Sequence, residues 1–546
     1  MSFKEFLKNK YTEIQTLDKI PTFLVPKEGI VEVAKFVKEN DFDFLMDLCG
    51  VDFPENEERF EVVYLFFSSK NYERIRLKVR TKDKVPSIVK IYKGADWFER
   101  EVYDMFGVQF EGHPDLRRIL TGDYFKGHPL RKDYPAGKRW KVLEEDVYKP
   151  SIESDEEKEL EEILINIGPS HPSTHGTFRL LAKLDGEVIR WMDAEIGYLH
   201  RCFEKMSETH IYQQVIPYTD RLNYCSSFLN NVGYCKAVEE MLSIEIPERA
   251  KLIRVILGEL SRIMDHLVCL AANIVDIGAL TNYWYLFQPR EEIYGILEKC
   301  CGARLTVSYC RIGGLSKDVP EDFKEMVEYV LKITPPLLND VDKLVSGNPI
   351  FLKRTMNVGK ISPEDAIAYG WTGPCLRAAG VPYDVRKAYP YYFYDEFDWD
   401  IPVGSAGDTY DRYQVRMEEM RQSLKIVKQA IERLKPGPVV VDDPRILLPP
   451  KKEVYNTMEG LIYNFEKVMF GLKVPKGEYY GFTEGANGEL GYYIVSDGTT
   501  KPYRVRVRPP CFAIYQAFPK MMVGQMVADS VAVLGSLNII AGELDR

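Results

Sequence analysis

Two of the seven histidines of this 546-residue chain, His171 and His175, lie in the segment Gly168-Pro-Ser-His-Pro-Ser-Thr-His-Gly176. Pro172 fixes its own φ and Gly176 allows backbone angles that other residues avoid, so a stiff loop is predicted here. An imidazole on such a loop, with an ordinary pKa near ~6.5, can face a metal, a substrate or a proton acceptor. The alternative is that both histidines only hydrogen-bond to the backbone, and the motif alone does not decide between the two.

Tyr224 and Asp276 are the other candidates for chemistry. Tyr224 follows the polar turn Tyr218-Thr-Asp-Arg221, but it is one of 34 tyrosines, and most tyrosines serve packing. Asp276 lies in an apolar run at the predicted end of a helix. A carboxylate there is costly unless it has a partner, for which an imidazole would serve. A capping or turn aspartate is the equal alternative.

The elements before these residues predict a small α/β domain over residues 1–135. Three β-rich runs, Val62–Phe67, Ile75–Arg80 and Ser87–Tyr92, indicate strands, and the second alternates apolar and polar side chains. Apolar residues at helical spacing predict a helix over Ala95–Phe106.

A basic, turn-rich tail ends this domain, and we expect it to dock on other proteins. It contains Arg117, Arg118 and Arg131. Residues 136–162 then run from basic to strongly acidic, and the charge run between Pro150 and Ile163 has almost nothing to bury. Residues 136–162 are therefore predicted to be the linker between two domains.

The second domain is predicted over residues 163–546 and positions all the candidates. It opens with a hairpin in which Ile163–Ile167 leads into the histidine loop and Phe178–Leu184 leads out of it. Three long helices follow from periodicity, over about 247–274, 321–338 and 413–434. The fold class is therefore α+β and multidomain, with a small α/β domain and a larger, mainly helical one that includes β-sheet elements.

Composition excludes several classes of function. A net charge of −10 disfavours a general nucleic-acid binder. None of the ten cysteines forms a C-x-x-C pair, so no metal or cluster site is predicted. Neither dinucleotide-binding nor P-loop glycine motifs occur, so nucleotide binding by those routes is not expected. The first residues lack a signal-peptide pattern and no run reaches the ~18 apolar residues of a membrane span, which predicts a cytoplasmic location.

Longer motifs carry a family resemblance over nearly the whole chain. The histidine loop, Ile196–Lys205, Arg311-Ile-Gly-Gly, Gly485–Gly498 and the final Asp545-Arg546 resemble the 49-kDa subunit of respiratory complex I. Glu99–Val108 and Gly112–Leu120 resemble its 30-kDa subunit. Both lie in one polypeptide, so the chain is similar to the fused C/D subunits of bacterial NADH:quinone oxidoreductase, a proton-pumping translocase.

The resemblance also implies a fold similar to the large subunit of nickel–iron hydrogenases. Those enzymes hold their metal pair with two C-x-x-C motifs, because four thiolates are needed. This chain has only isolated thiols such as Cys202 and Cys225, and its last cysteine is Cys511. A hydrogenase is therefore rejected.

The resemblance implies a quinone as substrate, with its headgroup between His175 and Tyr224. A quinone gains negative charge on two opposed oxygens during reduction, so a donor is needed at each end. Tyr224 and His175 would supply the protons, and Asp276 would orient and charge-stabilise His175. His171 would line the same site. We expect the unbalanced Asp276 charge, once His175 has lost its proton, to help couple reduction to proton translocation.

Two more residues are expected near the terminal [4Fe-4S] cluster of a neighbouring subunit. Arg221 matches the family arginine that faces this cluster, where a cation raises the reduction potential. Thr306 stands where family members often have a histidine, so a pH-linked potential is not expected, and a low-potential naphthoquinone would suit the site. Asn223 is a further departure, since an aspartate commonly precedes the tyrosine.

The remaining expectations concern partners. FMN, NADH and the iron–sulphur clusters are expected on other peripheral-arm subunits, and membrane-arm subunits are expected at the quinone entrance. The chain would then lie peripherally on the cytoplasmic face of the bacterial inner membrane and would not act alone as a homo-oligomeric enzyme. The alternative function is a noncatalytic assembly scaffold, in which the histidine loop is structural.

Overall fold

The computed structural model describes residues 3–137 and 163–546. The N-terminal domain is a five-stranded sheet of order β1-β2-β5-β4-β3 with helices beside it; β2 and β5 are parallel and the other neighbours antiparallel. Apart from residues 136 and 137, the predicted linker lies outside the described residues. The elements of this domain are α1 (Phe3–Lys10), β1 (Thr12–Ile14), β2 (Thr22–Leu24), η1 (Lys27–Gly29), α2 (Ile30–Glu39), β3 (Phe44–Asp52), β4 (Phe60–Phe67), β5 (Arg74–Thr81), β6 (Lys84–Pro86), α3 (Ala95–Phe106) and β7 (Gln109–Glu111).

Two of the three predicted strands and the predicted helix of this domain are confirmed, as β4, β5 and α3. The prediction of a strand over Ser87–Tyr92 is wrong. The backbone N–H of Ile88 donates to the Glu99 carboxylate at 2.8 Å, and the carbonyl of Ile88 accepts from the N–H groups of Ile91 and Tyr92. Ile88 and Tyr92 are buried by this turn, so their apolar character served packing rather than a sheet.

The second domain combines three small sheets with a helical layer. Its sheet orders are β10-β9-β8, β13-β14-β15 and β11-β12. The strands and short helices are β8 (Ile163–Ile167), η2 (Pro172–Thr174), β9 (Arg179–Asp185), β10 (Val188–Glu195), η3 (Tyr224–Ser226), β11 (Cys310–Arg311), β12 (Gly314–Leu315), the π-helical η4 (Asp342–Ser346), β13 (Gly477–Glu484), β14 (Glu489–Ser496) and β15 (Arg504–Arg508). The α-helices are α5 (Phe203–Thr209), α6 (Tyr212–Thr219), α7 (Ser227–Met241), α8 (Glu248–Asp276), α9 (Thr281–Cys301), α10 (Phe323–Val341), α11 (Pro349–Thr355), α12 (Pro363–Ala368), α13 (Gly373–Ala378), α14 (Val385–Ala388), α15 (Thr409–Arg433), α16 (Lys451–Asn456), α17 (Met458–Phe470), α18 (Pro510–Gln516), α19 (Phe518–Met522), α20 (Val527–Leu537) and α21 (Ala541–Leu544).

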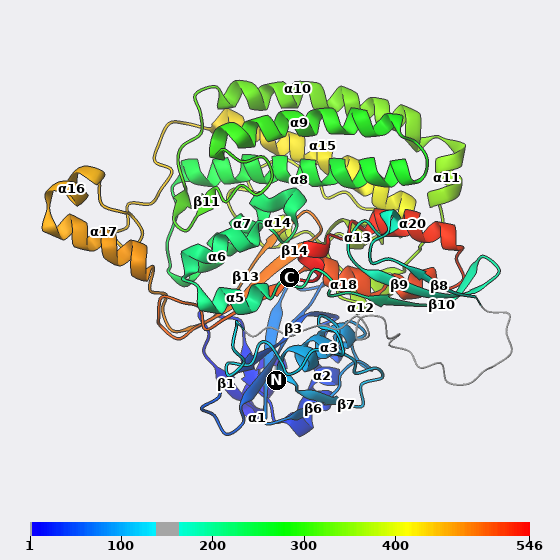
Figure 1. Cartoon of the computed structure of the whole chain (residues 1–546), viewed down its shortest axis with the longest axis horizontal. Helices are drawn as coiled ribbons and strands as arrows, with labels where there is room; N and C mark the ends of the chain where they lie inside the picture. The colour runs from blue at the N-terminus through cyan, green and yellow to red at the C-terminus, as the bar shows by residue number, and fades with distance from the viewer. Residues whose placement is uncertain (1–2, 138–162) are drawn as a thin grey trace.

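The long helix α8 is the centre of this domain. It packs against α9, α15 and α20, and α8, α9, α10 and α15 form the layer farthest from the N-terminal domain (Figure 1). The three helices expected from periodicity are confirmed as α8, α10 and α15, and the hairpin as β8 and β9. Because α8 has neighbours on several sides, its polar residues are buried as well, among them Arg254, Glu259, Arg262, Asp265 and His266.

Strand β15 joins the two domains through a row of buried arginines. Arg504, Arg506 and Arg508 alternate along the strand, so their side chains share one face. Arg504 and Arg508 donate to backbone carbonyl oxygens of β3 at 3.1 and 3.0 Å. Arg506 donates to Asp47 at 2.9 Å and also pairs with Glu101. Arg506 of the second domain thus neutralises buried carboxylates of the first domain.

Polar side chains of β5 are buried as well as its apolar ones. Arg74, Arg76 and Lys78 alternate with the apolar residues of the strand, and all three are buried. Arg74 forms a two-pronged hydrogen bond to Glu489 of the second domain, at 2.8 and 2.9 Å. This polar face of β5 therefore contacts the second domain.

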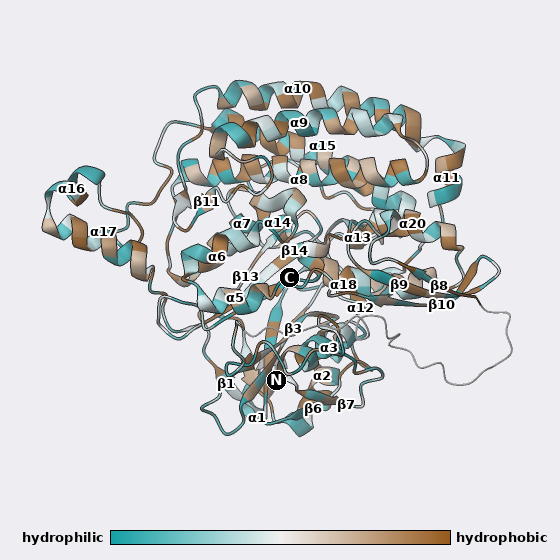
Figure 2. Ribbon diagram, in the orientation of Figure 1, coloured by the Kyte–Doolittle hydropathy of each residue, from teal (hydrophilic) through white to brown (hydrophobic). Residues whose placement is uncertain are grey.

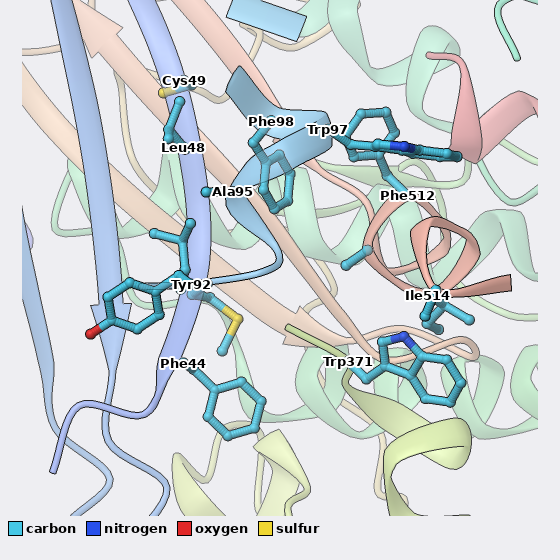
Figure 3. Packing of buried hydrophobic residues seen from close by; sticks show 14 of the residues in the cluster. Phe44, Leu48, Cys49, Tyr92, Ala95, Trp97, Phe98, Trp371, Phe512 and Ile514 are labelled. Atoms are coloured by element: carbon cyan, nitrogen blue, oxygen red, sulfur yellow. The ribbon is translucent and has the colours of Figure 1, made fainter. Parts of the chain in front are cut away.

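Apolar packing continues across the same boundary. Trp97 of α3 meets Phe512 of α18 edge to face, with ring centroids 5.3 Å apart (Figure 3). The basic tail also turns inward: Arg117 pairs with Asp193 of β10 at 3.1 Å, and Arg118 pairs with Asp104 at 2.7 Å. These two arginines therefore have partners within the chain, and docking of the tail on other proteins stays a prediction.

The hairpin of α16 and α17 projects from the body (Figure 1), and hydrophobic residues lie along it (Figure 2). Gly460 is the buried residue of α17, and α16 has none. The exposed apolar residues of the hairpin are Tyr455, Met458, Leu461, Ile462, Tyr463, Phe465, Val468, Met469 and Phe470.

Among the described residues, no helix combines the length and the apolar character that crossing a bilayer requires.

Candidate active site

The histidine loop connects β8 to β9 and is held by its own threonine. Thr174 is fully buried, and its hydroxyl donates to the carbonyls of His171 and Gly176 at 2.7 and 2.9 Å. The backbone of His175 is left-handed, with φ of 54°, a conformation that histidine tolerates better than most residues. The His175 side chain remains 23% exposed, whereas His171 is exposed and its carbonyl closes the turn.

Asp276 lies within contact of this histidine. Its Oδ2 contacts Nε2 of His175, and its side chain is 25% exposed. Asp276 is the last residue of α8, where backbone carbonyls point outward and the helix dipole opposes a negative charge. A carboxylate at this end cannot cap free N–H groups. The histidine is therefore the partner that accounts for its position, in place of the capping alternative.

Tyr224 opens the short helix η3 on a separate loop. The side-chain Oδ1 of Asn223 caps this turn by accepting from the N–H of Cys225 at 3.1 Å. Tyr224 is 37% exposed. Burial, followed by the neighbouring Cys225 and Asp265, raises the pKa of Tyr224 above its ordinary value. The phenol therefore holds its proton at neutral pH and is available as a hydrogen-bond donor.

Helix α8 supports both loops. Asn223 Nδ2 donates to Asp265 of α8 at 2.6 Å, while His175 contacts Asp276 of the same helix. Eleven residues separate the two aspartates, which corresponds to about 16 Å along the helix axis. His175 and the turn of Tyr224 are thus both held by contacts to the same rigid helix, although the two residues are 49 positions apart in sequence.

Helix α21 provides a second shared neighbour. A Cβ on Gly176 would lie 3.4 Å from Ala541, and a Cβ on Gly542 would lie 2.4 Å from the carbonyl oxygen of Arg221. The adjacent residues Ala541 and Gly542 therefore touch the histidine loop and the Arg221 turn respectively. A side chain at position 542 would displace that turn, which explains the glycine.

A pair of arginines lies beside Tyr224. Arg221 is 46% exposed, donates to the carbonyl of Pro217 at 2.6 Å and lies 3.7 Å from Asp220. Arg201 donates to the carbonyl of Arg221 at 2.6 Å. Burial, and then the charge of Arg221, lower the pKa of Arg201. Sequence reasoning missed Arg201, although it lies inside the motif Ile196–Lys205 that carries part of the resemblance.

The loop that contains Thr306 is tied to both of these segments. The N–H of Ser308 donates to Asp220 at 3.2 Å, and the carbonyl of Leu305 accepts from the Ser227 hydroxyl. Thr306 itself is half-buried. The structure therefore brings Tyr224, Arg221 and the Thr306 loop together, and brings His175 and Asp276 together at the far end of α8.

The candidate side chains do not line the cavity found in the described part of the chain. A cavity of about 550 Å³ is lined by residues of β11, β12 and α17, among them Arg311, Leu315 and Val468, and neither His175 nor Tyr224 lines it. The candidate side chains are instead partly exposed at the surface, so any enclosure of a ligand there needs a neighbouring protein. No cluster of three or more His, Cys, Asp or Glu residues suited to a metal ion occurs in residues 3–137 and 163–546.

Comparisons with known proteins agree over most of the chain. The family model described as respiratory-chain NADH dehydrogenase, 49 Kd subunit, matches residues 276–546, and that described as the 30 Kd subunit matches residues 23–139. The chain is 52% identical to the C/D subunit of NADH-quinone oxidoreductase of Bdellovibrio bacteriovorus, over 96% of this chain and 94% of that protein. It is 40% identical to the C/D 2 subunit of Aquifex aeolicus, over 96% and 95% of the two chains. The D 1 subunit of Sorangium cellulosum is 54% identical over 71% of this chain and 96% of that protein.

Proposed function

Because the chain belongs to the family of NADH-quinone oxidoreductase subunits in which the 30-kDa and 49-kDa parts are joined, we propose that its second domain forms the quinone-reduction site with a neighbouring iron–sulphur subunit. The His175–Asp276 contact is the observation that carries this proposal. A histidine held by a carboxylate at a helix end, and exposed on its other side, is arranged to pass a proton to a bound ligand.

The chemistry of a quinone fits two separated donors. Reduction places negative charge on both carbonyl oxygens, and two protons must accompany two electrons. Tyr224 has a raised pKa and remains a neutral donor, and His175 can donate as an imidazolium while Asp276 balances its charge. His171 lies on the same loop, further toward solvent, and would contact the entering ligand.

The arginine pair supports a cluster-bearing partner at the Tyr224 end. Arg201 and Arg221 are two cations at one turn, where Asp220 lies 3.7 Å from Arg221 and the charge of Asp545 acts on Arg201. Like charges at such a surface repel, and an anion from a neighbouring chain relieves the repulsion. A [4Fe-4S] cluster with thiolate ligands is such an anion, and a nearby cation raises its reduction potential. FMN and the other clusters are assigned to further subunits.

Coupling, membrane position and fold complete the proposal. When His175 loses its proton, the negative charge of Asp276 is no longer balanced. We propose that this unbalanced charge triggers proton translocation in membrane-arm subunits. The chain then lies peripherally at the cytoplasmic face of the inner membrane, with membrane-arm subunits at the quinone entrance. We further propose that the fold of the second domain is similar to that of the nickel–iron hydrogenase large subunit, without its metal ligands.

Asp276→Asn tests the relay. The amide preserves shape but cannot balance an imidazolium, so we expect the complex to assemble and its quinone-reductase turnover to fall by about tenfold or more. Turnover and proton pumping are measured in the purified complex. Asp322→Asn, which removes an exposed carboxylate paired with Lys299, is the matched control. Full turnover and pumping in Asp276→Asn would dispose of the relay.

Thr306→His tests the electrostatics near the cluster. Threonine cannot take up a proton when the cluster is reduced, so the midpoint potential of the native complex is expected to be nearly independent of pH. The histidine variant is expected to gain a dependence approaching about 59 mV per pH unit, the limit for one proton and one electron. Redox titrations followed by electron paramagnetic resonance between pH 6 and 8 measure both. A steep slope in the native complex contradicts this interpretation and the preference for a low-potential naphthoquinone.

A further inference from the structure

The carboxylate of Asp265 lies beneath the Tyr224 turn and is held by neutral hydrogen-bond donors. It is fully buried in the middle of α8. Its Oδ2 accepts from Asn223 Nδ2 at 2.6 Å and from the Ser226 hydroxyl at 3.1 Å, and its Oδ1 accepts from Asn538 Nδ2 at 2.7 Å. Within the described residues it forms no ion pair at salt-bridge distance. A buried charge held by neutral donors is costly, which calls for an explanation beyond stability.

Two of these donors flank the candidate tyrosine in sequence. Asn223 precedes Tyr224 and Ser226 ends its short helix, so Asp265 holds the turn from both sides. The ring of Tyr224 is thereby placed by a contact to a rigid helix rather than by the loop alone. A hydroxyl that must meet a ligand oxygen needs such placement, because small displacements of a donor cost large factors in rate.

The third donor leads to the other half of the site. Asn538 follows α20, and its Nδ2 also donates to Asn487 Oδ1 at 2.7 Å. Three residues later, Ala541 packs on Gly176 of the histidine loop. Asp265 therefore connects the Tyr224 turn to the segment that supports His175.

We propose that Asp265 is a positioning residue of the quinone site, which sets the placement of Tyr224 and of the segment behind His175 by accepting hydrogen bonds from both; this rests on the function proposed above. Asn223, which stands where the resemblance leads us to expect an aspartate, is then understandable. The carboxylate that a tyrosine turn would otherwise contain is supplied by the facing helix, and an amide on the turn completes the pair.

The directions of these hydrogen bonds allow the donor Asn223 and the acceptor Asp265 to be exchanged. Asn223 is oriented because its Oδ1 accepts from the Cys225 N–H, so its Nδ2 must face position 265. Asn538 is oriented in the same way by Asn487. In Asp265→Asn one amide NH₂ must therefore face another NH₂, whichever way the new amide turns. In Asn223→Asp two carboxylates meet at the 2.6 Å contact, and like charges repel.

The double variant Asn223→Asp/Asp265→Asn removes both conflicts. Its amide NH₂ at position 265 donates to the new carboxylate at position 223 and to Ser226, while its amide oxygen accepts from Asn538. The N–H of Cys225 still finds a carboxylate oxygen. The same hydrogen bond is thus rebuilt with donor and acceptor exchanged.

The experiment compares the two single variants and the exchange in the purified complex. We expect each single variant to lower kcat for quinone reduction by about tenfold or more, because the Tyr224 turn is displaced. We expect the exchange to recover kcat to within about threefold of the native complex, since the geometry is restored. NADH oxidation by ferricyanide, which bypasses the quinone, serves as the control and is expected to be unchanged.

The outcomes separate this inference from the proposed function. Native turnover in Asp265→Asn, or an exchange variant that assembles but stays as slow as the single variants, overturns the inference. If the single variants do not assemble, the exchange decides. If that also fails to assemble, Ser226→Ala must lower kcat by about threefold, and unchanged turnover refutes the proposal. Native turnover in Tyr224→Phe contradicts the proposed function itself, whereas an inactive Tyr224→Phe beside an active Asp265→Asn contradicts only the role of Asp265.

Discussion

Replacing Tyr224 with phenylalanine is expected to lower quinone reduction by the assembled complex by about 100-fold or more, because the step loses a positioned proton donor. The ring remains, so the packing of its turn on α8 is kept, and only the hydroxyl is removed. Tyr224 is 37% exposed and its pKa is raised, so it presents a protonated group that a ligand can reach. Steady-state turnover with a soluble quinone measures the effect.

Tyr218→Phe is the matched control for this experiment. Tyr218 lies six residues earlier, and its ring packs edge to face on Phe203 and His210. It loses the same atom at a position outside the proposed site, so turnover should stay near the native value. Native turnover in Tyr224→Phe as well would favour the noncatalytic scaffold, in which both loops are structural.

Replacing Arg506 with methionine is expected to be the most damaging change to the fold. Arg506 pairs with Asp47 at 2.9 Å, with Glu101 and, at 3.4 Å, with Glu204, and all of these groups are buried. Burial alone would raise the pKa of Glu204, but Arg504, Arg506 and the neighbouring Arg546 hold it below its ordinary value. Removing one partner of a buried pair typically costs about 3–5 kcal/mol.

The yield of assembled complex and its apparent Tm measure this loss. Arg190→Met is the control, because Arg190 pairs with Asp185 on the surface, with the arginine 57% exposed. Both variants remove one positive charge, but an exposed pair contributes only about 0–1 kcal/mol. Equal Tm values for the two variants would mean that the row of arginines on β15 does not hold the domains together.

The local elements of this fold could be predicted because their signals are local. Helical spacing places α3 and α8 to within a few residues, and turn residues place the hairpin around the histidine loop. The run Ser87–Tyr92 misleads because its apolar residues are buried by a turn, which the backbone hydrogen bond to Glu99 determines. A local strand pattern cannot indicate a hydrogen bond to a side chain eleven residues away.

The reacting groups proposed for the candidate site come from the sequence, whereas the residues that support them do not. His175, Tyr224 and Asp276 follow from residue type and from the resemblance, and the structure adds the contact between the first and the last. Asp265, Asn538 and Gly542 act through partners tens or hundreds of residues away. Nothing near them in sequence marks them, because their role exists only once α8 and α21 lie beside both loops.

The arginine row on β15 also bears on how such a molecule is made. Neither half presents a finished surface to water: the first would expose Asp47 and Glu101 without Arg506, and the second would expose Glu489 without Arg74. Joining the halves covalently turns their encounter into a first-order folding step, whose rate does not change on dilution. Each round of translation then delivers the halves in a one-to-one ratio, so that no orphan of either kind has to be stored or degraded.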